Sequence, residues 1–180
     1  EIFSAIYELH EIAVKLYHDN LFSKNGEEAL NYLYKRGVKK ETIKQFKIGY
    51  AENNWKQLVL HCKGKGFKRS QIIKSGLFTH SEKGIFDRFR NRIMFPVFNS
   101  SERPIAFGGR TLNIDEPAKY LNSPETALYK KGDIFYGIHA SRDAIRNSGY
   151  AILVEGYMDF LKLYQENIKP VVAISGTAFT

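Results

Sequence analysis

Two acidic side chains follow an apolar run near the end of the chain, in the stretch ILVEGYMDF at residues 152–160. If the aliphatic run is a buried strand, Glu155 lies at its carboxyl end, where open α/β sheets bind their ligands. Asp159 comes four residues later, in the first turn of the helix that would follow, and two such carboxylates suit Mg²⁺. A structural alternative stays open, because an acid in a first turn also stabilises the helix dipole and Glu–Gly can form a turn.

Three arginines alternate with other residues in the stretch DRFRNRIMFP at residues 87–96. If a strand runs through this stretch from Asp87, then Arg88, Arg90 and Arg92 lie on one face of it. A row of guanidinium groups suits phosphates, which arginine holds through paired hydrogen bonds. The alternative is a solvated polar face on a half-buried strand.

A fourth arginine, Arg110, follows a glycine pair in FGGR. Glycines there let the backbone bend or let another group come close, such as a strand of nucleic acid. Lys119 in KYLNSP and Lys131 in YKKG stand on loop-like segments, and position alone does not separate them from ordinary solvated lysines.

The positive charge is concentrated in one block of the chain. The whole chain has a net charge of +8, and residues 63–110 hold 11 basic and 3 acidic side chains. Such a concentration indicates a surface that meets a polyanion, although a solvated surface is the alternative.

The composition sets limits on the class of protein. The chain has 180 residues, of which 43% are apolar, as in a globular protein. A single cysteine, Cys62, excludes an internal disulfide and a zinc site built of cysteines, and fits a reducing compartment. No apolar run approaches the ~20 residues that cross a bilayer, so we expect no membrane association. The chain begins with Glu1 rather than Met, which indicates a piece of a longer protein.

The first half of the chain has helical patterns. Apolar residues recur at steps of three and four over residues 2–16, which predicts an amphipathic helix. Short helices that end at glycine are expected within residues 26–37, 39–49, 55–66 and 69–76.

Strands follow in the second half. RIMFPVFN and IAFGGRTL flank the turn SSERP and predict a β-hairpin, with Pro96 at a sheet edge or a bulge. KYLNSPE and YKKGDIFYG are typical of loops, and IHASRDAIRNSG of a helix that ends at Gly149. YAILV, YMDFLKLYQENI and KPVVAIS then predict a strand, a helix and a parallel strand, which form a βαβ unit. SGT at 175–177 is either a phosphate-binding turn or an ordinary one.

Several of these segments occur together in one order: DRFRNRIMFPVFNSSERPIAFGGRTL, KYLNSPETALYKKG, YGIHASRDAI, ILVEGYMDF and AISGTAFT. Over residues 85–180 the chain closely resembles the catalytic core of bacterial DNA primases of the DnaG type. The resemblance implies a mixed α+β and α/β fold. Residues 1–132 would form an N-terminal basic subdomain, helical over 1–84 and strand-rich over 85–132. Residues 133–180 would begin a TOPRIM subdomain, a small parallel-sheet fold, with its first βαβ unit.

The resemblance also implies an activity. Such primases copy single-stranded DNA into short RNA primers from ribonucleoside triphosphates, with Mg²⁺ or Mn²⁺. Glu155 would be a metal ligand and Asp159 a second catalytic acid, while further ligands lie beyond residue 180. The basic residues, together with Asn122, would bind nucleotide or nucleic acid: Arg88, Arg90, Arg92, Arg110, Lys119 and Lys131.

The family also has a zinc ribbon and a helicase-binding domain, which we expect outside this chain. We therefore expect an incomplete metal site and an inactive piece of a monomeric bacterial enzyme that works in the cytoplasm at the replication fork. Two alternatives remain: a non-catalytic module that binds single-stranded nucleic acid, or another TOPRIM enzyme such as a topoisomerase or nuclease.

Overall fold

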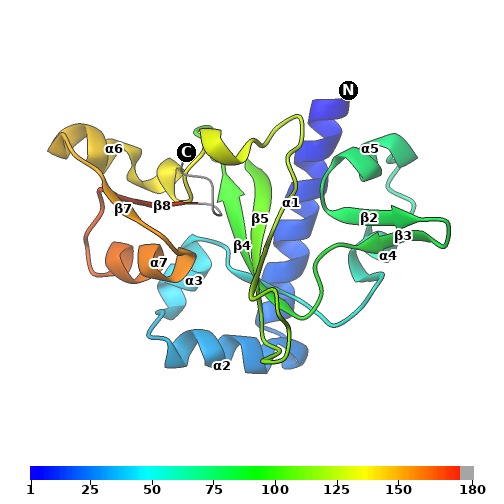
Figure 1. The fold of residues 1–180 in the computed structure, drawn as a ribbon, viewed down its shortest axis with the longest axis horizontal. Helices are drawn as coiled ribbons and strands as arrows, with labels where there is room; N and C mark the ends of the chain where they lie inside the picture. Colours follow the sequence, from blue (N-terminus) through cyan, green and yellow to red (C-terminus); the bar gives the residue numbers. More distant parts are fainter. Residues whose placement is uncertain (175–180) are drawn as a thin grey trace.

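The structure is a computed structural model that describes residues 1–174 (Figure 1). Its helices are α1 (Ile2–Leu21), α2 (Glu27–Lys35), α3 (Lys40–Gln45), α4 (Gln57–Cys62), α5 (Arg69–Lys74), α6 (Ile138–Ser148) and α7 (Tyr157–Gln165), with short 3-10 turns η1 (Lys24–Gly26) and η2 (Lys131–Asp133). Its strands are β1 (Gly49–Ala51), β2 (Phe78–Ser81), β3 (Gly84–Asp87), β4 (Arg92–Phe98), β5 (Pro104–Thr111), β6 (Tyr120–Asn122), β7 (Ile152–Val154) and β8 (Val171–Ala173).

The strands form three separate sheets. The central sheet is antiparallel with the order β1-β4-β5-β6, and helix α1 packs against its strands β1 and β5. The hairpin β2-β3 and helices α4 and α5 lie on one side of this sheet, and the parallel pair β7-β8 with α6 and α7 lies on the other (Figure 1). The mixed α/β class expected from the sequence is therefore confirmed.

The predicted helices all form, but the first half also contains strands that the sequence did not reveal. Strand β1 begins at Gly49, the glycine at which the helix of segment 39–49 was expected to end. The stretch 1–84, which was expected to be helical, is interrupted by β1 and β2, and β3 begins at its last residue. Strand β6 lies in the expected loop KYLNSPE. These predictions were wrong because short strands depend on their partners: β1 pairs with β4, and β6 pairs with β5.

The predicted hairpin is confirmed as β4 and β5. Pro96 pairs with Phe107 in its register, whereas β1 covers β4 only from Arg92 to Met94. Beyond Met94, β4 has no neighbour among the described residues on the side of β1 and is an edge strand there. Pro96 lies in this part of β4, so the N–H that proline lacks is not needed for a bond to β1. The register shifts between Val97 and Phe98, beside the proline.

The predicted βαβ unit is also confirmed, since β7 and β8 are parallel and α7 lies between them in sequence. The outer edge of β8 is met by Tyr136, whose backbone N–H donates to the carbonyl of Ala173 at 2.9 Å. The phosphate-binding role considered for residues 175–177 lies outside the described residues. No helix within residues 1–174 is long and apolar enough to cross a bilayer.

The βαβ unit shares a hydrophobic core with the central sheet. One buried cluster includes Ile93 and Phe95 of β4 together with Phe160 and Tyr164 of α7. Phe46, which follows α3, meets the rings of both Phe160 and Tyr164 edge to face, at 5.2 and 5.0 Å. The buried cluster therefore contains residues from both sides of residue 132. The division of the chain into two subdomains at that residue stays a prediction.

A second buried cluster, to which α1 contributes, lies against a histidine whose burial makes stability depend on pH. His10 is fully buried against the ring of Phe107, and its Nδ1 bonds the carbonyl of Ile6 at 2.8 Å. Burial lowers the pKa of His10 from 6.5 to about 4. Because the folded-state pKa lies below the unfolded one, this stability is present above pH 6.5 and is lost as the pH falls toward 4.

We expect the His10→Gln variant to lose less stability on acidification than the wild type, by about 2–3 kcal/mol between about pH 7.5 and about pH 4.5. Urea unfolding at both pH values measures the difference. A His61→Gln variant is the control, because His61 is exposed on α4. Equal pH dependence in His10→Gln and wild type would contradict the assignment.

Candidate nucleic-acid interface and acidic turn

The acidic turn, residues 155–159, lies where the sequence predicted it. Glu155 is exposed and directly follows β7, and Asp159 is exposed in the first turn of α7. The Asp159 carboxylate lies over the turn, because a Cβ placed on Gly156 would come within 3.2 Å of its Oδ2. Both acids thus stand at the carboxyl end of β7.

The donor chemistry of the turn fits a hard cation. Two exposed carboxylates match the one or two that Mg²⁺ takes from a protein. Within residues 1–174 no group of three or more His, Cys, Asp or Glu side chains could hold a metal. A third His, Cys, Asp or Glu ligand beside these two acids would therefore come from outside the described part of the chain.

The arginines of DRFRNR do not form a row on one strand. Strand β3 ends at Asp87 and β4 begins at Arg92, and Asn91 between them has a left-handed backbone with φ of 50°. The prediction that the three arginines share one strand face was therefore wrong. The stretch in which arginines alternate with other residues is a turn between two strands, and the three arginine side chains have different environments.

Arg92 is buried and bonded to backbone. It is 7% exposed, and its Nη1 donates to the carbonyls of Gly109, Ala118 and Lys119 at 3.0–3.2 Å. It joins β5 to the start of β6, which is a structural role. Arg88 is partly buried, and its Nη2 donates to the carbonyl of Asn122 at 3.1 Å.

Asp87 fixes the turn that carries Arg88 and Arg90. Its carboxylate is 2% exposed and accepts the N–H groups of Leu58 and Val59, in the first turn of α4, at 2.8 and 2.9 Å. Burial raises the pKa of this carboxyl, while the two N–H bonds act in the opposite direction. Arg90 closes the turn by donating to the Asp87 carbonyl.

An exposed aromatic platform lies beside this turn. The Arg90 guanidinium stacks over Trp55, 3.6 Å from the ring centroid, and Trp55 is 58% exposed. Phe86 meets Trp55 edge to face at 5.9 Å, and Lys56 lies 5.1 Å from the Phe86 ring. We call Trp55, Lys56, Phe86 and Arg90 the Trp55 cluster. An exposed aromatic ring among cations is typical of surfaces that stack the bases of single-stranded nucleic acid.

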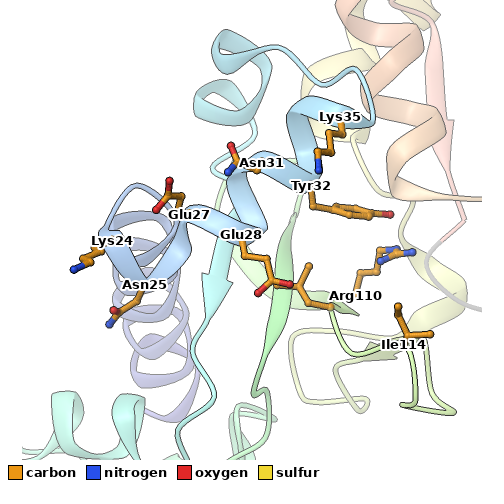
Figure 2. Close-up of a pocket in the computed structure, with 10 residues that line it drawn as sticks. Lys24, Asn25, Glu27, Glu28, Asn31, Tyr32, Lys35, Arg110 and Ile114 are labelled. Carbon is orange, nitrogen blue, oxygen red and sulfur yellow. The ribbon is translucent and has the colours of Figure 1, made fainter.

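Arg110 points into a pocket between β5 and α2 (Figure 2). Its guanidinium lies 4.5 Å from the Tyr32 ring centroid, and Arg36 lies 5.8 Å from the same ring. The pocket has a volume of about 770 Å³ and is also lined by Lys35 of α2. The helical first half therefore contributes basic, aromatic and acidic side chains to the surface around Arg110, the acids being Glu27 and Glu28.

The remaining predicted residues are spread along the chain between β5 and α6. Lys119 is exposed, and its carbonyl accepts the N–H of Thr111 at 2.9 Å. Asn122 lies in β6, where its Oδ1 accepts the Tyr157 hydroxyl at 2.8 Å. Lys131 begins η2, and its backbone N–H donates to the Glu125 carboxylate at 3.3 Å.

Sequence reasoning missed Trp55, Tyr32 and Arg36. The only signal for Trp55 was that the single tryptophan of the chain stands next to a lysine. Tyr32 lies in α2 and Arg36 directly after it, in a segment whose sequence showed only the acidic start and the terminal glycine of a helix. Arg110, which meets the Tyr32 ring, is more than 70 residues away in sequence.

Comparison with solved structures defines the class of the fold. The RNA polymerase domain of Mycobacterium tuberculosis primase DnaG, in complex with a double-stranded DNA oligomer with a 6-nucleotide overhang, aligns with a TM-score of 0.93 and 32% identity, over 98% of this chain and 56% of that one. A DnaG primase catalytic domain bound to single-stranded DNA aligns with a TM-score of 0.87 and 36% identity, over 99% and 56%. The fold is that of a primase catalytic core.

The chain belongs to the family described as the DNA primase catalytic core, N-terminal domain, which matches residues 16–142. DNA primase from Clostridium acetobutylicum is 41% identical over the whole chain, and that from Deinococcus radiodurans is 39% identical over 97% of it. The chain spans 30% of the length of each. The similarity covers the helical first half as well, where sequence reasoning found no specific motif.

Proposed function

We propose that this chain is part of the catalytic core of a DNA-directed RNA polymerase that makes short RNA primers on single-stranded DNA. The observation that carries the proposal is the combination of two features on a primase fold: an exposed pair of acids at a strand end, and an exposed cationic and aromatic surface on the same chain. The acids serve nucleotidyl transfer, and the surface binds the template.

Glu155 and Asp159 have the chemistry that nucleotidyl transfer needs. A primer 3′-hydroxyl loses its proton and attacks the α-phosphate of a ribonucleoside triphosphate, which displaces pyrophosphate. Bare carboxylates would repel the triphosphate anion. Bound Mg²⁺, or Mn²⁺ in its place, would supply charge neutralisation and stabilise the charge that builds during transfer. Glu155 would be its ligand, with Asp159 beside it and further ligands from beyond residue 180.

The basic residues divide into two groups. Arg90 in the Trp55 cluster is placed to hold the template, with Arg88 beside it in the same turn. Arg110, Lys119 and Lys131, which come later in the sequence, are proposed to bind the triphosphate or the primer. Arg92 is left out of the proposed interface because its guanidinium is buried on backbone carbonyls.

Replacing Trp55 with alanine is expected to weaken binding to single-stranded DNA by about 1–3 kcal/mol, roughly 5- to 150-fold in Kd, because one stacked base loses its platform. Fluorescence anisotropy of a labelled oligonucleotide measures Kd. Tyr150→Ala is the matched control, since Tyr150 is an aromatic residue of similar exposure, 57%, that lies next to β7. Binding of Trp55→Ala equal to wild type would remove the Trp55 cluster from the interface.

The proposed activity is tested with the full-length gene product, single-stranded DNA, the four ribonucleoside triphosphates and Mg²⁺. Short RNA products complementary to the template are expected, and none without the divalent ion. DNA binding without synthesis would favour the non-catalytic module. DNA relaxation or cleavage would favour another TOPRIM enzyme.

The proposal extends to the setting of the enzyme. A primase of this family would act as a monomer in the bacterial cytoplasm, at the replication fork, with the replicative helicase as partner through a separate domain. Zinc would be bound in another separate domain. The proposal of a separate zinc domain is consistent with a solved Aquifex aeolicus primase, which is described as containing zinc-binding and RNA polymerase domains. This chain covers 44% of that one.

A further inference from the structure

A ring from α7 fills the space above one glycine of the central sheet. A Cβ added to Gly108 of β5 would come within 2.3 Å of Cζ and the hydroxyl oxygen of Tyr157. No real Cβ tolerates such a distance from a rigid ring, so only glycine leaves room for Tyr157 here. The close approach expected at the FGGR glycines is therefore made by a protein side chain, whereas the sequence had suggested a strand of nucleic acid.

Other contacts hold the same ring on several sides. It stacks on Phe95 of β4, with centroids 4.9 Å apart and planes 7° apart, and it meets Tyr136 edge to face at 4.8 Å. Its hydroxyl donates to Asn122 Oδ1 at 2.8 Å, and the Asn122 carbonyl accepts Arg88 Nη2 at 3.1 Å. Tyr157 is 4% exposed, so stacking and a buried hydrogen bond together fix its position.

These contacts join two parts of the molecule that share no strand pairing. The sheet β7-β8 and the central sheet are separate. Tyr157 stands two residues after Glu155 and two before Asp159, while Gly108 stands two residues before Arg110. The packing of the Tyr157 ring against Gly108 therefore fixes the distance between the acidic turn and Arg110.

We infer that Tyr157 is a positioning residue, which holds the acidic turn in register with the basic sheet through Gly108 and Asn122. The inference rests on the proposed function, because it assigns Tyr157 a part in the reaction at that site. It also revises the role of Asn122, whose side-chain oxygen holds Tyr157. Reactions that depend on positioning are sensitive to small displacements, and a shift of about 1 Å can cost ~100-fold in rate.

The test uses Tyr157→Phe in the full-length gene product, which removes one hydroxyl and keeps the ring. We expect kcat for primer synthesis to fall roughly 10-fold, while KM for nucleotides and Kd for single-stranded DNA stay unchanged, because the acids shift but the binding residues do not. The matched control is Tyr164→Phe on the same helix, whose hydroxyl lies 3.4 Å from the Ala140 carbonyl, away from the basic sheet. That variant should keep the wild-type kcat.

A second variant separates positioning from substrate contact. Asn122→Leu should reproduce the kcat loss of Tyr157→Phe, and the double variant should lose no more than either single one, because both break the same bond. A raised KM in Asn122→Leu together with additive losses would mean that Asn122 contacts the substrate, and would overturn the inference. A kcat of Tyr157→Phe equal to wild type or to Tyr164→Phe would overturn it as well.

Hydrogen exchange gives a readout that does not depend on activity. Backbone amides of residues 155–158 should exchange faster in Tyr157→Phe than in wild type, and unchanged exchange would contradict the inference. If the wild-type protein makes no primers, the proposed function fails, and the exchange result still decides whether Tyr157 holds the acidic turn.

Discussion

Replacing Glu155 with glutamine is expected to lower primer synthesis by the full-length protein at least about 100-fold, while its affinity for single-stranded DNA stays unchanged. Glutamine keeps the size of the side chain and removes its negative charge. Glu155 is exposed at the end of β7, so the substitution disturbs no buried contact. The loss would therefore come from the missing metal ligand, and the Trp55 cluster would still bind the template.

The measurement compares the rate of RNA synthesis at saturating nucleotide and DNA with Kd from anisotropy on the same preparation. Glu8→Gln is the matched control, since Glu8 is an exposed glutamate on α1, and it should keep the wild-type rate. Titration with Mg²⁺ should show no concentration that restores synthesis in Glu155→Gln. Synthesis at the normal rate would show that the metal role assigned to Glu155 is wrong.

The acidic turn could be placed from the sequence because its causes are local. An aliphatic run that ends in Glu155–Gly156 and continues with helical periodicity leaves little choice of structure. The parallel pairing of β7 and β8 follows from the short connection through one helix. The hairpin of β4 and β5 was equally local, with a polar turn between two apolar runs.

The basic surface could not be placed in this way because its contacts are distant in sequence. Alternation in DRFRNR matches a strand, yet the left-handed backbone of Asn91 breaks the strand there. Arg90 turns toward Trp55, 35 positions earlier, and Gly108 receives Tyr157 from 49 positions later. A single sequence contains no record of such pairs. The glycine pair therefore predicted either a bend or a close approach, and the partner in that approach could not be named.

Arg92 provides the sharpest test of this difference between local pattern and tertiary contact. We expect Arg92→Met to lower the free energy of unfolding by about 3 kcal/mol or more, because the carbonyls of Gly109, Ala118 and Lys119 lose a buried donor. Methionine keeps most of the apolar stem and removes the guanidinium. Urea unfolding measures the change, and an unchanged m-value would show that the native and unfolded states still differ by the same exposed surface.

The same variant distinguishes a structural arginine from a phosphate ligand. Arg146→Met is the stability control, because Arg146 is an exposed arginine of α6, paired only weakly with Asp143 at 3.9 Å. Under conditions where Arg92→Met remains folded, its affinity for single-stranded DNA should stay close to wild type, whereas Arg90→Met should bind more weakly. Wild-type stability with reduced DNA affinity in Arg92→Met would return Arg92 to the phosphate-binding residues that the sequence pattern predicted. Since the guanidinium is buried against three carbonyls, we expect the opposite: the residue stabilises the sheet on which the interface is built.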